Sequence, residues 1–162
     1  MPELVSYGRQ VSLLAEEHPH KTAIVFVPVD GPERLVTWQE LDRRSNQIAR
    51  LMAERRVDDR SLVAIGLPNC PEHIFAQYGA WKLGALVLPM RSVLPQRERD
   101  AILEVGTPAL VVADWDDLGW PQLTSAELAD SRAMDDGSLP DRVPHPGKAI
   151  GSGGSTGRPK II

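Results

Sequence analysis

Three strongly apolar segments separated by two helical patterns constrain this fold more than any other feature of the chain. The apolar segments are SLVAIGL (61–67), ALVLP (85–89) and PALVVAD (108–114), and helices are expected over 71–83 and 96–105. Strands that are apolar on both faces belong in a parallel sheet that helices cover on each side. We therefore predict an α/β fold with a parallel β-α-β-α-β sheet flanked by helices and right-handed crossovers.

A small antiparallel strand pair is predicted near the N-terminus, where an Asp-Gly turn separates KTAIVFV (21–27) from RLVT (34–37). Thr37 and Glu40 then form the pattern of a capping box, which marks the start of a helix that runs to about residue 55. Another helix is expected before the first strand, from residue 5 to residue 17. The charges of the capped helix are expected on a solvated face: Asp42, Arg43, Arg44, Arg50 and Glu54.

The remaining elements are weaker. Asn69 and Gly84 are expected to cap the two ends of the helix over 71–83, and Gly106 to close the next helix. A short helix is expected over 124–130, followed by an exposed connector rich in Pro, Gly and Asp over 131–147.

The overall composition excludes several functional classes. The chain has 162 residues, enough for one domain, and its net charge of −4 comes without a basic block, so nucleic acid is not an expected partner. No apolar stretch approaches the ~18 residues of a membrane span, and the start does not resemble a secretory signal. The single cysteine, Cys70, fits a reducing compartment. We expect a cytoplasmic protein without a membrane span.

Isolated residues offer little chemistry of their own. Cys70 lies at a helix start, where a thiolate is favoured, yet no histidine partner is evident and a structural role is expected. His18 and His20 form an H-x-H pair without further ligands, so no metal site is predicted.

The chemistry is concentrated in the stretch GSGGSTGRPK (151–160). Its glycines let several backbone amides approach one anion, its hydroxyls add donors, and its lysine adds a positive charge, a combination that suits a polyphosphate. The order of residues does not fit the P-loop pattern G-x-x-x-x-G-K-[ST], and composition alone is equally compatible with a disordered Gly/Ser tail. The candidate phosphate-binding residues are Ser152, Gly153, Gly154, Ser155, Thr156, Gly157 and Lys160.

SGGSTGRPK resembles the phosphate-binding signature of the adenylate-forming (AMP-binding) enzymes, which include acyl-CoA synthetases and the adenylation domains of peptide synthetases. The segments VTWQELDRRSNQIARLM, LVAIGLPNCPEHIFAQYGAWKLGALVLPM and ILEVGTPALVVAD resemble further parts of the same enzymes, in the expected order. AWKLGA and the loop look most like acid–CoA ligases of the bile-acid and fatty-acid type. Gly153 and Ile161 depart from the commoner loop signature. Arg91 and Ser92 in MRSVLP stand where many members have a polar-proline pair, so this stretch supports no inference about the substrate.

The resemblance implies an ATP-dependent acid–thiol ligase that forms an acyl-adenylate and transfers the acyl group to CoA, with Mg²⁺ as cofactor and a carboxylic acid as substrate. It implies that residues 1–162 are the N-terminal part of the large AMP-binding domain, ending at the phosphate-binding loop, and that the catalytic residues lie downstream. Such a part is expected to be inactive alone. It is expected to associate with the downstream part or with a second copy as a homodimer.

Two other functions remain open from the sequence. One is an adenylation domain that loads a carrier protein instead of CoA. The other is a non-catalytic nucleotide-binding or interaction module.

Overall fold

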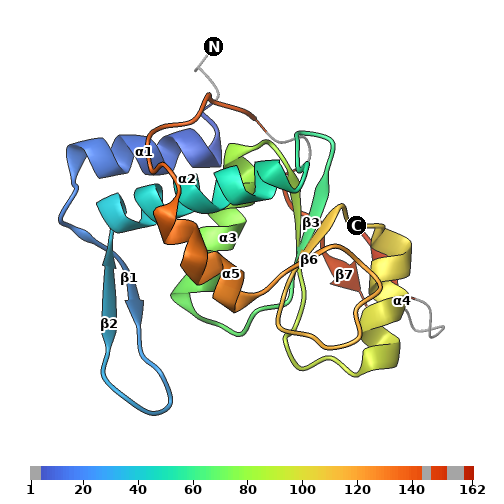
Figure 1. The fold of residues 1–162 in the computed structure, drawn as a ribbon. Helices are drawn as coiled ribbons and strands as arrows, with labels where there is room; N and C mark the ends of the chain where they lie inside the picture. Colours follow the sequence, from blue (N-terminus) through green and yellow to red (C-terminus); the bar gives the residue numbers. More distant parts are fainter. Residues whose placement is uncertain (1–4, 144–146, 153–158) are drawn as a thin grey trace.

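The computed structural model describes residues 5–143, 147–152 and 159–162. A central parallel sheet separates three N-terminal helices on one side from a single helix on the other, and a two-stranded hairpin projects away from this body (Figure 1). The elements are α1 (Tyr7–Glu17), β1 (Thr22–Phe26), β2 (Arg34–Thr37), α2 (Trp38–Glu54), β3 (Leu62–Ile65), α3 (Pro71–Lys82), β4 (Leu86–Pro89), α4 (Gln96–Gly106), β5 (Leu110–Val112), β6 (Gln122–Leu123), α5 (Ser125–Asp130), the 3-10 turn η1 (Ser131–Ala133), β7 (Gly151–Ser152) and β8 (Lys160–Ile161).

The four strands of the central sheet follow the order β4-β3-β5-β6 and all pair in parallel. This confirms the predicted α/β class and its parallel β-α-β-α-β unit. The sequence did not predict β6, because a strand of two residues carries no alternation that could be recognised. The predicted antiparallel pair is confirmed as β1 and β2, which pair from Thr22–Thr37 to Phe26–Arg34.

Both faces of the sheet are buried, as the apolar strands predicted. On β3, Val63 and Ile65 join a core cluster with α1, α2 and α3, whereas Ala64 joins a second cluster with Leu103 of α4. Phe75 of α3, fully buried, belongs to the first cluster. The strands therefore carry helices on both sides, and their ends are left free to present loops.

The caps agree with the sequence in part. The Thr37 hydroxyl accepts from the Glu40 amide at 3.1 Å, as expected, but the Glu40 carboxylate accepts from Arg34 instead of completing the box. A complete capping box occurs at α5, between Thr124 and Glu127. Gly84 takes a left-handed backbone (φ 77°) after α3, as predicted.

Two predicted caps are wrong. Cys70, not Asn69, is the N-cap of α3, because Pro71 occupies the first helical position. After α4 the left-handed residue is Thr107 (φ 44°), so the helix continues through Gly106.

The charged face of α2 is solvated only in part, because Arg43 and Glu54 are exposed as expected but other charges of the set are not. Arg44 is only 8% exposed, and Asp42 accepts a 2.6 Å ion pair from the buried Lys82 of α3. Lys82 also reaches Asn46 of α2 at 2.5 Å and Ser12 of α1 at 3.4 Å. This polar cluster ties α1, α2 and α3 together, and a pattern based on charge alone could not distinguish it from a surface.

The connector after α5 is exposed but held in place. Polar side chains of α2 donate to its backbone carbonyls: Asn46 to Asp136 at 2.9 Å, Gln47 to Arg132 at 3.1 Å and to Met134 at 3.2 Å, and Arg50 to Gly137 at 2.9 Å. The prediction of an exposed segment is correct for most of its side chains, yet its backbone is fixed to α2. In the part of the chain that the structure describes, no helix has the length and apolar character needed to cross a membrane.

Candidate functional site

The chain approaches the glycine-rich loop along the edge of the central sheet. Lys148 forms a parallel bridge with Val87 of β4, and the amide of Ala149 donates to the Val87 carbonyl at 2.8 Å. Because this segment runs parallel to β4, residues 151 and 152 lie beyond the point where it passes β4, toward the carboxyl end of that strand. Open α/β sheets bind their ligands at the carboxyl ends of their strands.

A short antiparallel pair holds the two ends of the loop. β7 and β8 pair Gly151 with Ile161 and Ser152 with Lys160, and the amides of Ile150 and Ile162 each donate to the other residue's carbonyl, at 2.9 and 3.0 Å. Two of the candidate phosphate ligands, Ser152 and Lys160, are thus direct partners across the strands. The backbone therefore brings together residues that are eight positions apart in the sequence.

The other candidate ligands cannot be placed. Gly153, Gly154, Ser155, Thr156 and Gly157 lie outside the described residues. Among the candidates, the side chain of Lys160 is described, and it is exposed.

The base of the hairpin is anchored on both sides. Ile161 packs into the second core cluster, and a Cβ atom added to Gly106 of α4 would lie 2.9 Å from its Cδ1. On the incoming side, the indole Nε1 of Trp81 donates to the Gly147 carbonyl at 2.6 Å. The loop thus begins and ends on rigid elements.

An aromatic residue that the sequence did not single out covers the carboxyl edge beside this hairpin. Trp115 follows β5 and packs over Gly66 at the end of β3, so closely that a Cβ atom on Gly66 would lie 2.3 Å from the indole ring. Its Nε1 donates to the Ser92 carbonyl at 2.8 Å, and the buried Arg99 stacks on its ring at 5.4 Å. Trp115 could have been identified from the sequence as a large aromatic residue immediately after a predicted central strand.

The isolated cysteine and histidine candidates have the surroundings of structural residues. Burial raises the pKa of the Cys70 thiol, which disfavours a reactive thiolate. The Nδ1 of His73 lies 3.2 Å from the Leu67 carbonyl. Within the described residues no group of three or more His, Cys, Asp or Glu side chains could hold a metal ion.

A parallel sheet with helices on both faces, extended beside β4 by a glycine-rich hairpin, defines an α/β protein with a candidate anion site at the carboxyl edge. More specifically, the chain belongs to the AMP-binding enzyme family, whose model matches residues 12–162. The predicted family membership is therefore confirmed.

Similar curated proteins include peptide synthetases and a CoA ligase. The chain is 28% identical over 139 residues to a dimodular nonribosomal peptide synthase of Bacillus subtilis and 33% identical over 163 residues to bacitracin synthase 3 of Bacillus licheniformis. It is 32% identical over 99 residues to crotonobetaine/carnitine–CoA ligase of Citrobacter koseri. These matches cover 78%, 96% and 61% of the chain but only 6%, 2% and 19% of the respective relatives.

Solved structures share the fold. The N-terminal subdomain of Klebsiella oxytoca NpsA matches 98% of the chain with a TM-score of 0.81 at 21% identity, and the chain covers 41% of it. A Mycobacterium tuberculosis fatty acyl CoA synthetase matches 97% with a TM-score of 0.82 at 20% identity, and the chain covers 34% of it. The fold is therefore shared with the NpsA N-terminal subdomain and with part of the fatty acyl CoA synthetase.

Proposed function

We propose that residues 1–162 form the N-terminal part of the large AMP-binding domain of an ATP-dependent acid–CoA ligase. The observation that carries the proposal is the pairing of Ser152 with Lys160 at the two ends of SGGSTGRPK, within a chain of the AMP-binding family. The proposed reaction joins a carboxylic acid to the CoA thiol, with ATP as the source of energy. The proposed location is the cytoplasm.

The proposed chemistry has two steps. A carboxylate oxygen attacks the α-phosphorus of ATP, the bond to pyrophosphate breaks, and an acyl-adenylate forms. The sulfur of CoA then attacks the acyl carbon and AMP leaves, taking the electron pair of the broken carbon–oxygen bond, while the thiol proton passes to a base or to water. The first step makes a poor acyl donor reactive, because AMP is a far better leaving group than oxide.

The role of the loop follows from the charge that pyrophosphate gathers as it departs. Donors that are already in place stabilise such charge without reorganisation. The hydroxyls of Ser152, Ser155 and Thr156 and the amides of Gly154 and Gly157 are proposed to hold the β- and γ-phosphates, together with Gly153. Lys160 is proposed to supply positive charge.

Mg²⁺ would share the charge of the phosphates when bound. The described residues contain no cluster of acidic or histidine ligands for it, so its protein ligands are expected downstream together with the acyl pocket and the catalytic residues. Residues 1–162 alone should therefore release no pyrophosphate above background from ATP, CoA and a panel of carboxylic acids. Turnover by the isolated chain contradicts this proposal.

The decisive experiment replaces Lys160 and Thr156 by alanine in a form of the enzyme that includes the downstream part. Each lost charge-assisted hydrogen bond is worth roughly 1.5–3 kcal/mol, so the double variant should bind ATP at least 10-fold more weakly and form adenylate more slowly. Calorimetric titration with ATP and acid-dependent pyrophosphate exchange measure the two effects. Unchanged affinity and exchange reject the proposed role of the loop.

A second candidate acceptor is a carrier protein. Two of the curated relatives are peptide synthetases, and another similar structure is an artificially fused adenylation–PCP di-domain from Klebsiella oxytoca. Adenylate formed by the downstream-extended enzyme can be offered to CoA and to a phosphopantetheinylated carrier protein in parallel. Transfer to CoA alone supports the ligase, and transfer to the carrier alone supports the adenylation domain.

Two further expectations concern binding partners. ATP binding by residues 1–162 without any turnover favours a nucleotide-binding or interaction module. Association with a second copy is measured by sedimentation velocity, in which a homodimer gives a mass twice that of the 17.8 kDa chain.

A further inference from the structure

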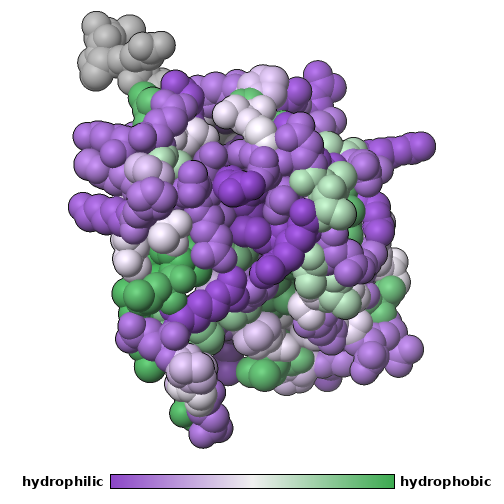
Figure 2. Space-filling model, turned by 60° about the vertical axis from the view of Figure 1, so that its left-hand side comes forward, coloured by the Kyte–Doolittle hydropathy of each residue, from purple (hydrophilic) through white to green (hydrophobic). Residues whose placement is uncertain are grey.

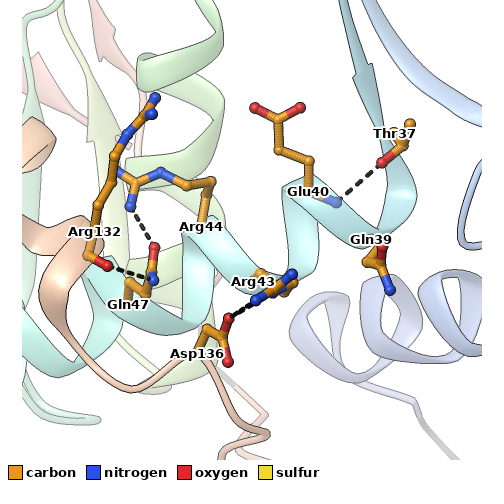
Figure 3. Close-up of a pocket in the computed structure, with 8 residues that line it drawn as sticks. All are labelled: Thr37, Gln39, Glu40, Arg43, Arg44, Gln47, Arg132 and Asp136. Carbon is orange, nitrogen blue, oxygen red and sulfur yellow. Dashed lines mark hydrogen bonds and ion pairs between the residues drawn. The ribbon is translucent and has the colours of Figure 1, made fainter.

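A hollow of about 290 Å³ lies between the first half of α2 and the segment that follows α5 (Figure 3). The charged side chains that line it are Glu40, Arg43, Arg44, Arg132 and Asp136. Arginine is in excess over acid in this set, by three residues to two. The hollow is separate from the glycine-rich hairpin, which lies on the other side of the sheet beside α4 (Figure 1).

Both acids of the hollow are already engaged. Asp136 accepts from the guanidinium of Arg43, through both Nε and Nη2. The Glu40 carboxylate accepts from Arg34 at 3.3 Å. Arg44 and Arg132 therefore remain without an ion-pair partner among the described residues, although Glu72 and Glu40 are near enough to favour the charge of Arg44.

Arg44 is the more unusual of the two arginines, because it is 92% buried. Its Nη1 donates to the Gln47 side chain and its Nη2 donates to the Leu128 carbonyl at 2.8 Å, whereas its Nε is buried without a partner. A buried charge is costly unless an opposite charge lies near. The pKa of Arg44 is lowered, first by burial and then by the positive charge of Arg132.

Arg132 brings a second guanidinium to the same place. In Figure 3 its side chain extends from the segment after α5 toward the guanidinium of Arg44. Its side chain is exposed, while its backbone carbonyl is fixed by Gln47 at 3.1 Å. Figure 2 shows a predominantly hydrophilic face on the side of the molecule that carries the N-terminal helices. An incoming ion thus meets Arg132 first, with the charge of Arg44 behind it.

We propose that this hollow binds a phosphate-type oxyanion at the guanidinium of Arg132, in the positive field of the buried Arg44. Guanidinium groups bind oxyanions through two parallel donors, which suits a tetrahedral oxyanion better than a spherical halide. Arg132 is the ligand that contacts the anion directly, and Arg44 stabilises it through charge. The anion can be free phosphate or a phosphate group on a larger molecule.

Calorimetric titration of inorganic phosphate into the chain tests the proposal, at constant ionic strength with chloride as the competing anion. The titration is done in the Thr156→Ala/Lys160→Ala background, so that binding at the proposed nucleotide loop does not contribute. One saturable site is expected. Arg132→Gln should weaken phosphate binding at least 10-fold, whereas Arg97→Gln, the same change at an exposed arginine of α4, should leave it unchanged.

Phenyl phosphate in place of inorganic phosphate distinguishes the two sources of the anion. Tighter binding of phenyl phosphate supports a phosphate carried by a larger molecule, and equal or weaker binding supports the free ion. Absence of saturable binding overturns the proposal, and so does an equal effect of Arg132→Gln and Arg97→Gln. Because the loop is already disabled in this background, these outcomes do not depend on the proposed ligase activity.

Discussion

The indole of Trp81, in the last turn of α3, donates a 2.6 Å hydrogen bond to the carbonyl of Gly147. Four residues later the chain enters β7 and the glycine-rich loop. Trp81 is buried and packs edge-to-face on Tyr78, with ring centroids 5.1 Å apart. A side chain of the hydrophobic core therefore fixes the segment that leads into the proposed phosphate site.

Replacing Trp81 by Phe should loosen this segment more than the rest of the fold. Phe keeps an apolar ring but has no donor for Gly147, so the adjoining bond from the Ala149 amide to Val87 should open more often. Amide hydrogen exchange measures the effect, and Ala149 should exchange at least 10-fold faster than in the unmodified chain. A uniform increase across β3 and β5 as well would indicate general destabilisation and contradict the local role.

Gly66→Ala should destabilise the carboxyl edge of the sheet. The added methyl would lie 2.3 Å from the Trp115 ring, which is itself held by Ser92, so overpacking should cost about 1–3 kcal/mol. Gly119→Ala is the matched control, because no atom lies within 4 Å of the position of its Cβ. Urea unfolding of the two variants gives the comparison. Equal midpoints would show that the Trp115 ring moves aside without cost, which would contradict the prediction.

The sheet and its helices could be predicted because their signals are local. Three apolar segments with helical patterns between them have few alternatives to a parallel sheet, and Thr37 is a strong helix start. Long-range polar contacts carried no such signal. The sequence placed Arg44 on a solvated face, since its partner Leu128 lies 84 residues away, and it gave no sign of the pair between Asp42 and Lys82, which are 40 residues apart.

Asp42→Asn should be strongly destabilising, because it leaves the ammonium of Lys82 buried beside a neutral side chain. Lys82 is 4% and Asp42 15% exposed, and breaking a buried pair costs about 3–5 kcal/mol. The double change Asp42→Leu/Lys82→Met should cost less than Asp42→Asn alone, since no unpaired charge remains. Glu16→Gln, which breaks an exposed pair with Arg9, should cost less than about 1 kcal/mol. Chemical denaturation measures all three, and equal losses for Asp42→Asn and Glu16→Gln would contradict the prediction.

Stability should fall in acid partly through Glu127 of the α5 capping box. Hydrogen bonding from the Thr124 amide and the pairing with Arg55 lower the pKa of Glu127 below 4.5 in the folded chain. A carboxyl group with a lowered folded pKa stabilises above its unfolded value, and this contribution is lost as the pH falls from about 4.5 through the folded pKa. Glu127→Gln should therefore differ from the unmodified chain at pH 7 and converge with it at low pH. A difference that is constant with pH would rule out ionisation of Glu127 as the cause.

For the candidate site, the sequence suggested residues but not their surroundings. The pattern GSGGSTGRPK pointed to Ser152 and Lys160, and the backbone makes them partners. The sequence singled out neither Trp81 nor Trp115. Their role as donors to the carbonyls of Gly147 and Ser92 depends on contacts across 66 and 23 residues that no short motif encodes.

The segment around Lys148 has a consequence beyond the nucleotide loop. By bonding to Val87, it occupies the amide and the carbonyl of that residue in the middle of β4, which forms one edge of the central sheet. The opposite margin is formed by β6, only two residues long. Neither edge of the sheet therefore presents a long row of unpaired backbone amides to which another chain could add as a strand. In a variant whose segment around Lys148 is detached, the edge backbone of β4 would be exposed, and the protein would become prone to forming fibrils.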